Sequence, residues 1–268
     1  GLMYKIEDII NKVHCADCLS FMKDIPNGSA DLILCDLPYG LTACRWDTLI
    51  PLPLLWIEYK RVIKPAGVIV LTASQPFTSI LVCSNPKDFK YAWVWDKSLP
   101  TGFQMCRIRP LKQHEDILIF CQEVGTYNPQ KEPRTKPRKY NRGPARVGGE
   151  TLNEVKHDGQ DRVLTHYEPR SILRVQNADN ARKQHPTQKP VALFDYLIRT
   201  YSNPGEVILD SCIGAGTTAV AAIQTGRRFI GIEIDPGYCE IARKRIAQAR
   251  EQQDLFRKPE ITVQEKLL

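Results

Sequence analysis

The chain of 268 residues lacks any apolar run that approaches the roughly 20 residues a membrane-spanning helix needs. Residues 1–11 mix acidic side chains with apolar ones and offer no small-residue cleavage site, unlike a secretory signal peptide. No internal repeat is visible, which excludes a solenoid or propeller. With 43% hydrophobic and 25% charged residues, the composition is that of a globular protein long enough for one α/β core.

The nine cysteines form neither a disulfide framework nor a zinc-site pattern. Their number is odd and they are scattered from Cys15 to Cys239, which in a chain of this length favours reduced thiols. Cys15 and Cys18 form a C-x-x-C pair, but no second pair or suitably spaced histidines accompany it. A chance pair beside a strand is favoured over a ligand pair, and we expect no metal.

Complete glycine-rich nucleotide fingerprints are also missing. Gly214 and Gly216 are followed by Thr-Thr-Ala where a dinucleotide fingerprint has its third glycine, and no lysine supplies a P-loop. What is present is an alternation of short apolar runs, typical of buried parallel strands, with helix patterns. Strands are predicted at 12–17, 31–36, 67–72, 89–95, 116–121, 207–210 and 229–234, with helices at 18–24, 52–62, 75–83, 191–201, 217–224 and 237–250.

Two stretches depart from this texture. Residues 98–111 contain Gly, Pro and Arg and are predicted to be a loop between two strands. Residues 122–183 are rich in Pro, Gly and basic side chains and have no long apolar periodicity. We therefore expect an α/β core with a large insertion at 122–183.

The segment from Asp210 to Thr218 follows a predicted strand and opens a helix. Its glycines allow a ligand to approach the backbone at the carboxyl ends of the strands. The next strand ends at Glu233 and Ile234, where an acid can accept hydrogen bonds from ribose hydroxyls. The pattern favours a site for a nucleoside-bearing cofactor, the alternative being a tight turn without a ligand.

The tetrapeptide Asp36-Leu37-Pro38-Tyr39 leaves the end of another buried strand. An aromatic ring beside a carboxylate can hold a planar base that carries an exocyclic amine. Asp36 and the Leu37 carbonyl would accept hydrogen bonds from the amine, Pro38 turns the chain away and Tyr39 stacks on the ring. The alternative is a simple exit from the strand, with no catalytic role.

Basic side chains are concentrated in one part of the insertion. Seven of them, against the single acid Glu132, account for nearly all of the net charge of +7. A local patch of this kind suits a polyanion such as nucleic acid, although a solvated loop is the alternative. The predicted phosphate-binding residues are Lys131, Arg134, Lys136, Arg138, Lys139, Arg142 and Arg146.

These motifs resemble those of the DNA amino-methyltransferases that act on adenine N6 or cytosine N4. The family's D/N/S-P-P-Y and D-P-F-x-G-x-G-T-T segments correspond to Asp36–Tyr39 and Asp210–Thr218. Further matches are His185-Pro186-Thr187-Gln188-Lys189-Pro190, which leads into the cofactor loop, and Arg61-Val62-Ile63-Lys64-Pro65-Ala66-Gly67, a helix-to-strand step. Trp95-Asp96-Lys97 and His114-Glu115 resemble the stretches beside the family's target-base pocket. Leu37 replaces a proline and Ser211-Cys212 replaces Pro-Phe; the second departure reduces the expected contact with the cofactor.

The resemblance implies a fold and a cofactor. The fold is a circularly permuted, Rossmann-like class I methyltransferase fold, with a mostly parallel seven-stranded sheet and helices on both faces. Residues 1–268 would be one domain, and the basic insertion 122–183 its target-recognition region. S-adenosylmethionine would be bound by Asp17, Cys18, Lys189, Asp210, Cys212, Gly214, Gly216, Thr217, Glu233 and Ile234.

The resemblance also implies an activity. Asp36 at the first motif position points to adenine N6 rather than cytosine N4, and the base would be flipped out of double-stranded DNA. A cytosine N4 enzyme and a decayed DNA-binding relative are the alternatives. A homodimer is expected, as is a location in the cytoplasm of a bacterial or phage-infected cell without a membrane partner.

Overall fold

The computed structural model describes residues 3–40, 49–140, 162–176 and 188–256. The predicted phosphate-binding residues Arg142 and Arg146 lie outside these ranges. The chain divides into two compact units, one comprising 1–128 with 171–268 and the other comprising 129–170. Each unit is described separately.

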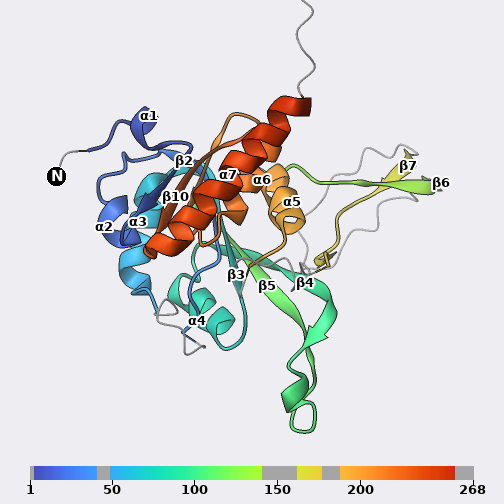
Figure 1. Cartoon of the computed structure of the whole chain (residues 1–268). Coiled ribbons are helices and arrows are strands. Elements are labelled where there is room, and N and C mark those ends of the chain that lie inside the picture. Colours follow the sequence, from blue (N-terminus) through green and yellow to red (C-terminus); the bar gives the residue numbers. More distant parts are fainter. Residues whose placement is uncertain (1–2, 41–48, 141–161, 177–187, 257–268) are drawn as a thin grey trace, which may run out of the picture. The chain divides into compact units, whose positions relative to one another are not determined.

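The first unit is built on one eight-stranded sheet (Figure 1). From edge to edge its strands are β1 (Lys12–Cys15), β10 (Arg228–Glu233), β9 (Val207–Asp210), β2 (Ala30–Cys35), β3 (Ile63–Ala73), β5 (Lys112–Phe120), β4 (Phe89–Thr101) and β8 (Ile172–Arg174). The five strands from β1 to β3 are parallel, whereas β5 runs antiparallel to both of its neighbours. The last core strands of the chain therefore lie between the first two.

Alternation along the strands divides the apolar residues between two faces. Leu32 and Leu34 of β2 belong to a core with α5 (Val191–Tyr201), α6 (Thr217–Gln224) and α7 (Pro236–Phe256). Ile33 and Cys35 belong to the opposite core. That core includes α1 (Ile6–Ile9), α2 (Cys18–Met22), α3 (Leu52–Val62) and α4 (Phe77–Ser84).

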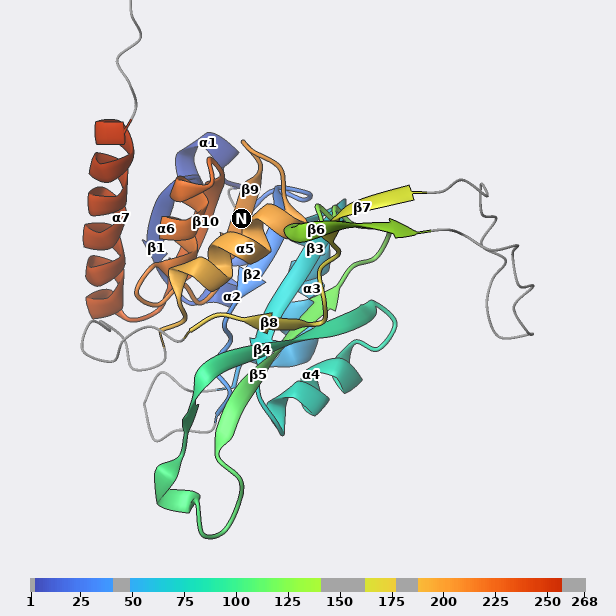
Figure 2. The same cartoon turned by 90° about the vertical axis from the view of Figure 1, so that its right-hand side faces the viewer.

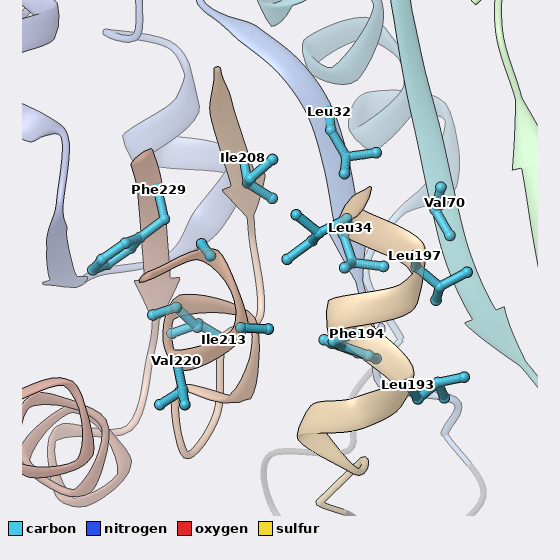
Figure 3. Close-up of a cluster of buried hydrophobic side chains, with 14 of the residues drawn as sticks. Leu32, Leu34, Val70, Leu193, Phe194, Leu197, Ile208, Ile213, Val220 and Phe229 are labelled. Carbon is cyan, nitrogen blue, oxygen red and sulfur yellow. The ribbon is translucent and has the colours of Figure 1, made fainter. Parts of the chain in front are cut away.

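Helix α5 shows how sequence spacing produces this packing. Leu193, Phe194 and Leu197 recur at helical spacing, are fully buried, and point toward Leu34 and Val70 of the sheet (Figure 3). On the same face α7 lies beside α6 in both overall views (Figures 1 and 2). Helices thus cover both faces of the sheet, as the sequence predicts.

The structure corrects two details of the prediction. The short strand β8 pairs in parallel with β4, so the sheet has eight strands rather than seven. Residues 98–101 of the predicted loop 98–111 belong to β4, which continues to Thr101, whereas residues 102–111 connect β4 to β5 (Figure 2). Between them lies the 3-10 turn Phe103–Met105.

The second unit, within the predicted insertion, contains an antiparallel pair. Its strands are β6 (Glu132–Tyr140) and β7 (Arg162–Tyr167), whose register shifts between Pro133 and Arg138. Sequence periodicity misses them because Pro and charged residues replace the apolar alternation. None of the helices in the described ranges is long and apolar enough to span a membrane.

Candidate active site

Four neighbouring strands bring the predicted functional residues to one edge of the sheet. β1, β10, β9 and β2 are parallel, so the segments that follow them emerge on the same side. Asp17 and Cys18 follow β1, Glu233 ends β10, Asp210 ends β9 and Asp36 follows β2. This edge is where open α/β sheets bind their ligands.

The loop after β9 has a backbone that depends on its glycines. Gly214 and Gly216 have φ values of +51° and +81°, in the left-handed region. A Cβ on Gly216 would lie 3.0 Å from the Cβ of Ala242, whereas a Cβ on Gly214 would meet nothing within 4 Å. Gly216 therefore permits close packing against α7, and Gly214 leaves open space beside the backbone.

Glu233 connects this loop to the end of β10. Its Oε2 accepts a hydrogen bond from the Gly214 N–H at 2.8 Å, and its Oε1 accepts one from the Asp235 N–H at 3.0 Å. Burial raises the pKa of this carboxyl. A carboxylate has about four lone-pair positions, so Glu233 retains capacity to accept hydrogen bonds from ribose hydroxyls. Ile234 beside it is exposed and offers an apolar surface.

Asp210 holds the same loop from inside. Its carboxylate accepts hydrogen bonds from the Cys212 N–H, at 3.0 Å, and from the Thr218 hydroxyl. Cys212 is partly exposed, whereas Thr217 is buried and accepts a hydrogen bond from Arg245 at 3.4 Å. Sequence reasoning did not identify this structural role of Asp210, which the strand position alone could not reveal.

At the end of β1, Asp17 is exposed and accepts a hydrogen bond from the Ser20 N–H at 2.8 Å, which caps α2. Cys18 is buried in the core beneath it. These two residues thus lie at the same sheet edge as Glu233. Their predicted contact with a cofactor stays a prediction.

Asp36 is the centre of a second cluster at this edge. Its Oδ1 accepts hydrogen bonds from the Tyr39 hydroxyl, at 2.8 Å, and from the Thr72 hydroxyl. Its Oδ2 lies 2.7 Å from the Nζ of Lys189. Sequence analysis did not identify Thr72, although a polar residue near the end of a buried strand is a usable signal.

The Tyr39 ring is held in one orientation. Its hydroxyl is bonded to Asp36, and its ring centroid lies 5.2 Å from that of Phe77 at an interplanar angle of 31°. Burial and the Asp36 charge raise the pKa of the phenol well above its usual value, so it stays a donor. Leu37 is buried, whereas Pro38 is partly exposed.

Lys189 links Asp36 to charged residues of strands β5 and β4. Its Nζ lies 3.3 Å from Oε2 of Glu115, whose Oε1 accepts a hydrogen bond from Lys97 at 2.7 Å. Sequence analysis places Lys97 and Glu115 in motif matches without assigning them roles, and it assigns Lys189 to the cofactor. In the structure the Lys189 ammonium pairs with Asp36, and its contact with the cofactor stays a prediction.

The predicted phosphate-binding residues of the second unit form a mostly exposed group. Lys136, Arg138 and Lys139 are exposed on β6. Lys131 pairs with Glu168 at 2.7 Å, and Arg134 donates to the His166 carbonyl and stacks on the Tyr167 ring at 3.9 Å. Two of the five described members therefore also stabilise the hairpin.

The residues at the sheet edge fit S-adenosylmethionine. Glu233 and Asp17 could accept hydrogen bonds from ribose and adenine groups, Ile234 is an exposed apolar side chain, and the backbone at Gly214 is open. Within the described ranges, no cluster of three or more His, Cys, Asp or Glu side chains is arranged to hold a metal ion.

The permuted sheet and this site define a class I methyltransferase that uses S-adenosylmethionine. The chain belongs to the DNA methylase family of the N6-adenine and N4-cytosine type, which matches residues 30–244. It is therefore a DNA amino-methyltransferase. Over 258 residues it is 30% identical to the DNA adenine methyltransferase YhdJ of Escherichia coli (strain K12). The alignment covers 86% of this chain and 80% of that protein.

Solved structures show the same fold. The M1.HpyAVI–SAM complex is 25% identical, with a TM-score of 0.59, covering 87% of this chain and 98% of that one. The cytosine-N4-specific PvuII DNA methyltransferase is 15% identical, with a TM-score of 0.60 and 90% of each chain covered. The expected family, fold class and cofactor are thereby confirmed.

The first prediction concerns Asp210, whose pKa burial raises to about 7. The unfolded carboxyl ionises near pH 3.9, so its contribution to the free energy of unfolding falls as the pH rises from about 4 to about 7. Asn at this position cannot ionise. As the pH rises from about 5 to about 7.5, the free energy of unfolding of Asp210→Asn, measured with urea, should therefore increase relative to that of the wild type. A wild-type–variant difference that does not change with pH would contradict this.

Proposed function

We propose that this protein transfers a methyl group from S-adenosylmethionine to N6 of adenine at a specific site in double-stranded DNA, acting in the cytoplasm. Family membership supports amino-group methylation of DNA. Asp36 as the first residue of its segment supports adenine, as does the similarity to a protein named a DNA adenine methyltransferase. Transfer to cytosine N4 is the second candidate, because the fold is shared with a cytosine-specific enzyme.

The observation that carries the proposal is the hydrogen bonding of Asp36. Its Oδ1 already accepts from Tyr39 and Thr72, and its Oδ2 accepts from Lys189. With about four lone-pair positions on a carboxylate, one position on Oδ2 is left among these contacts. The side chain is 22% exposed, so part of it can be reached from outside. An exocyclic amine could donate one hydrogen to it and the other to a nearby carbonyl, for which we propose Leu37.

S-adenosylmethionine supplies an activated methyl group on a sulfonium. The chain's own residues would then position the amine and stabilise the positive charge that develops on its nitrogen, for which the Asp36 carboxylate is suited. Tyr39, fixed by its hydroxyl and by Phe77, would stack on the base. Because a base paired within the helix cannot reach Asp36 and Tyr39, it must first be flipped out of the helix.

For the second unit we propose contact with the DNA backbone. Lys136, Arg138 and Lys139 are exposed cations on β6, and phosphate contacts of this kind position a protein on a duplex. We retain 1–268 as one methyltransferase domain and 122–183 as its target-recognition region. Pairing of two copies stays part of the proposal, without a surface assigned to it.

The second prediction is the identity of the product. With labelled S-adenosylmethionine and duplex DNA, the enzyme should incorporate label that is recovered as N6-methyladenine after digestion to nucleosides. Nucleoside chromatography separates this product from N4-methylcytosine. Recovery of N4-methylcytosine alone would exclude adenine, and cofactor binding without transfer to nucleic acid would favour a decayed enzyme.

The third prediction concerns Asp36 itself. Asp36→Ala and Asp36→Asn remove the charge that stabilises the transition state, and each should lower the single-turnover rate about 100- to 1000-fold. The dissociation constant for S-adenosylmethionine, measured by calorimetry, should change little. Asp195→Asn, which removes an ion-paired carboxylate on α5, is the matched control. An Asp36 variant that retains full activity would refute the assigned role.

The fourth prediction concerns the basic side chains of β6. Replacing Lys136, Arg138 and Lys139 together by Gln should weaken DNA binding and reduce the slope of log affinity against log salt by about 0.9 for each phosphate that is no longer neutralised. A variant with Lys87→Gln and Lys90→Gln, which removes exposed cations of the first unit, is the control. An unchanged salt slope, measured by fluorescence anisotropy, would show that the β6 cations do not bind phosphates.

A further inference from the structure

Lys189 lies between two carboxylates that belong to different parts of the sheet. Its Nζ is 2.7 Å from Oδ2 of Asp36, after β2, and 3.3 Å from Oε2 of Glu115, on β5. The lysine side chain is only 8% exposed. A buried ammonium at this position cannot rely on water and depends on these two acids for its stabilisation.

Glu115 is incompletely satisfied, although it is largely buried. Its Oε1 accepts a hydrogen bond from Lys97, but Oε2 is buried without a hydrogen-bond partner among the described residues. Such an atom is rare in native proteins and calls for an explanation. The Nζ of Lys189 lies 3.3 Å from Oε2 and donates a hydrogen bond to Asp36, and its three N–H groups allow it to serve both acids.

Acids and cations alternate around Lys189, and Lys112 is a further cation whose charge acts on Glu115. Asp36 and Glu115 are acids, and Lys189 and Lys97 are the cations between and behind them. Burial alone would lower the pKa of Lys189, but the charges of Asp36 and Glu115 outweigh it and raise the pKa. Burial would likewise raise the pKa of Glu115, yet Lys189 and Lys97 hold it below its usual value. Lys189 and Glu115 are therefore both charged at neutral pH.

The position of Lys189 presents a problem for methyl transfer. The cation occupies part of Oδ2, the oxygen that still has room for the target amine, and it would repel the positive charge that develops on that amine. Glu115, whose Oε2 lies 3.3 Å from Nζ, holds the ammonium beside Asp36 and offsets part of its charge.

We propose that Lys189 is a positioning residue: held by Glu115, it orients the Asp36 carboxylate so that the remaining position on Oδ2 is available to the amine of the target base. This inference rests on the proposed function, since it concerns the same transfer. It also assigns Lys189 to the base side of the site rather than to the cofactor.

The test is a double-mutant cycle with Lys189→Met, Glu115→Gln and the combination of both. Lys189→Met should leave the dissociation constant for S-adenosylmethionine within about twofold while lowering the single-turnover rate about 10- to 100-fold. Lys189→Arg, which keeps the charge, should recover part of the rate. Glu115→Gln should also slow transfer, but the double variant should be no slower than Lys189→Met, because Glu115 acts through Lys189.

The matched control uses the other end of the same strand. Lys64 pairs with Asp31 at 2.5 Å where β2 begins, so Lys64→Met breaks a lysine–aspartate pair far along the strand from Asp36. This variant should methylate DNA at the wild-type rate. Thermal unfolding of every variant identifies any loss of rate that comes from loss of the fold.

Three results would overturn the inference. A Lys189→Met enzyme with wild-type rate would show that the lysine does not position Asp36. A tenfold rise in the dissociation constant for S-adenosylmethionine, with the rate at saturation intact, would place Lys189 at the cofactor. If the rate losses of the two single variants multiplied in the double variant, Glu115 would act independently of Lys189. Wild-type enzyme that transfers no methyl group to DNA in this assay would instead refute the proposed function.

Discussion

The parallel pairing of β2 with β9 is the constraint on which the site depends. Leu32 and Ile33 pair with Ile208 and Leu209, across a sequence separation of about 176 residues. Because paired parallel strands end at the same edge, the segment after β2 and the glycine loop after β9 must emerge side by side. A slip of one residue would exchange the two apolar faces of β2, so burial on both sides fixes the register and with it the place of Asp36 relative to the glycine loop.

The polar groups at that edge show why the site is rigid before any ligand binds. Glu233 and Asp210 hold the glycine loop through backbone hydrogen bonds, and Asp36 is bonded by Tyr39, Thr72 and Lys189. Each acid is at least partly buried and would be costly if unpaired. The bonds that satisfy it therefore also orient it. A group oriented in advance need not reorganise during the reaction, which is the physical source of much enzymatic rate enhancement.

Much of the fold follows from the sequence because its signals are local. The apolar runs of β2, β3, β9 and β10 and the spacing of α5 identify these elements, and the motif order identifies the permutation. What the sequence could not reveal is non-local. The pairing of Lys189 with Asp36 joins residues 153 positions apart, and no periodicity encodes it. Strands β6 and β8 are short or lack apolar alternation, so their signals are too weak to recognise.

The contacts of Lys189 indicate its role more directly than its place in a sequence motif does. A motif identifies the residue as functional because it lies beside the cofactor loop in sequence, but proximity in sequence does not tell which ligand it serves. The ion pair with Asp36 and the nearby unsatisfied oxygen of Glu115 are specific to the fold. A buried lysine between two acids is held in place by both of them, so it can fix the orientation of the Asp36 carboxylate before any ligand binds.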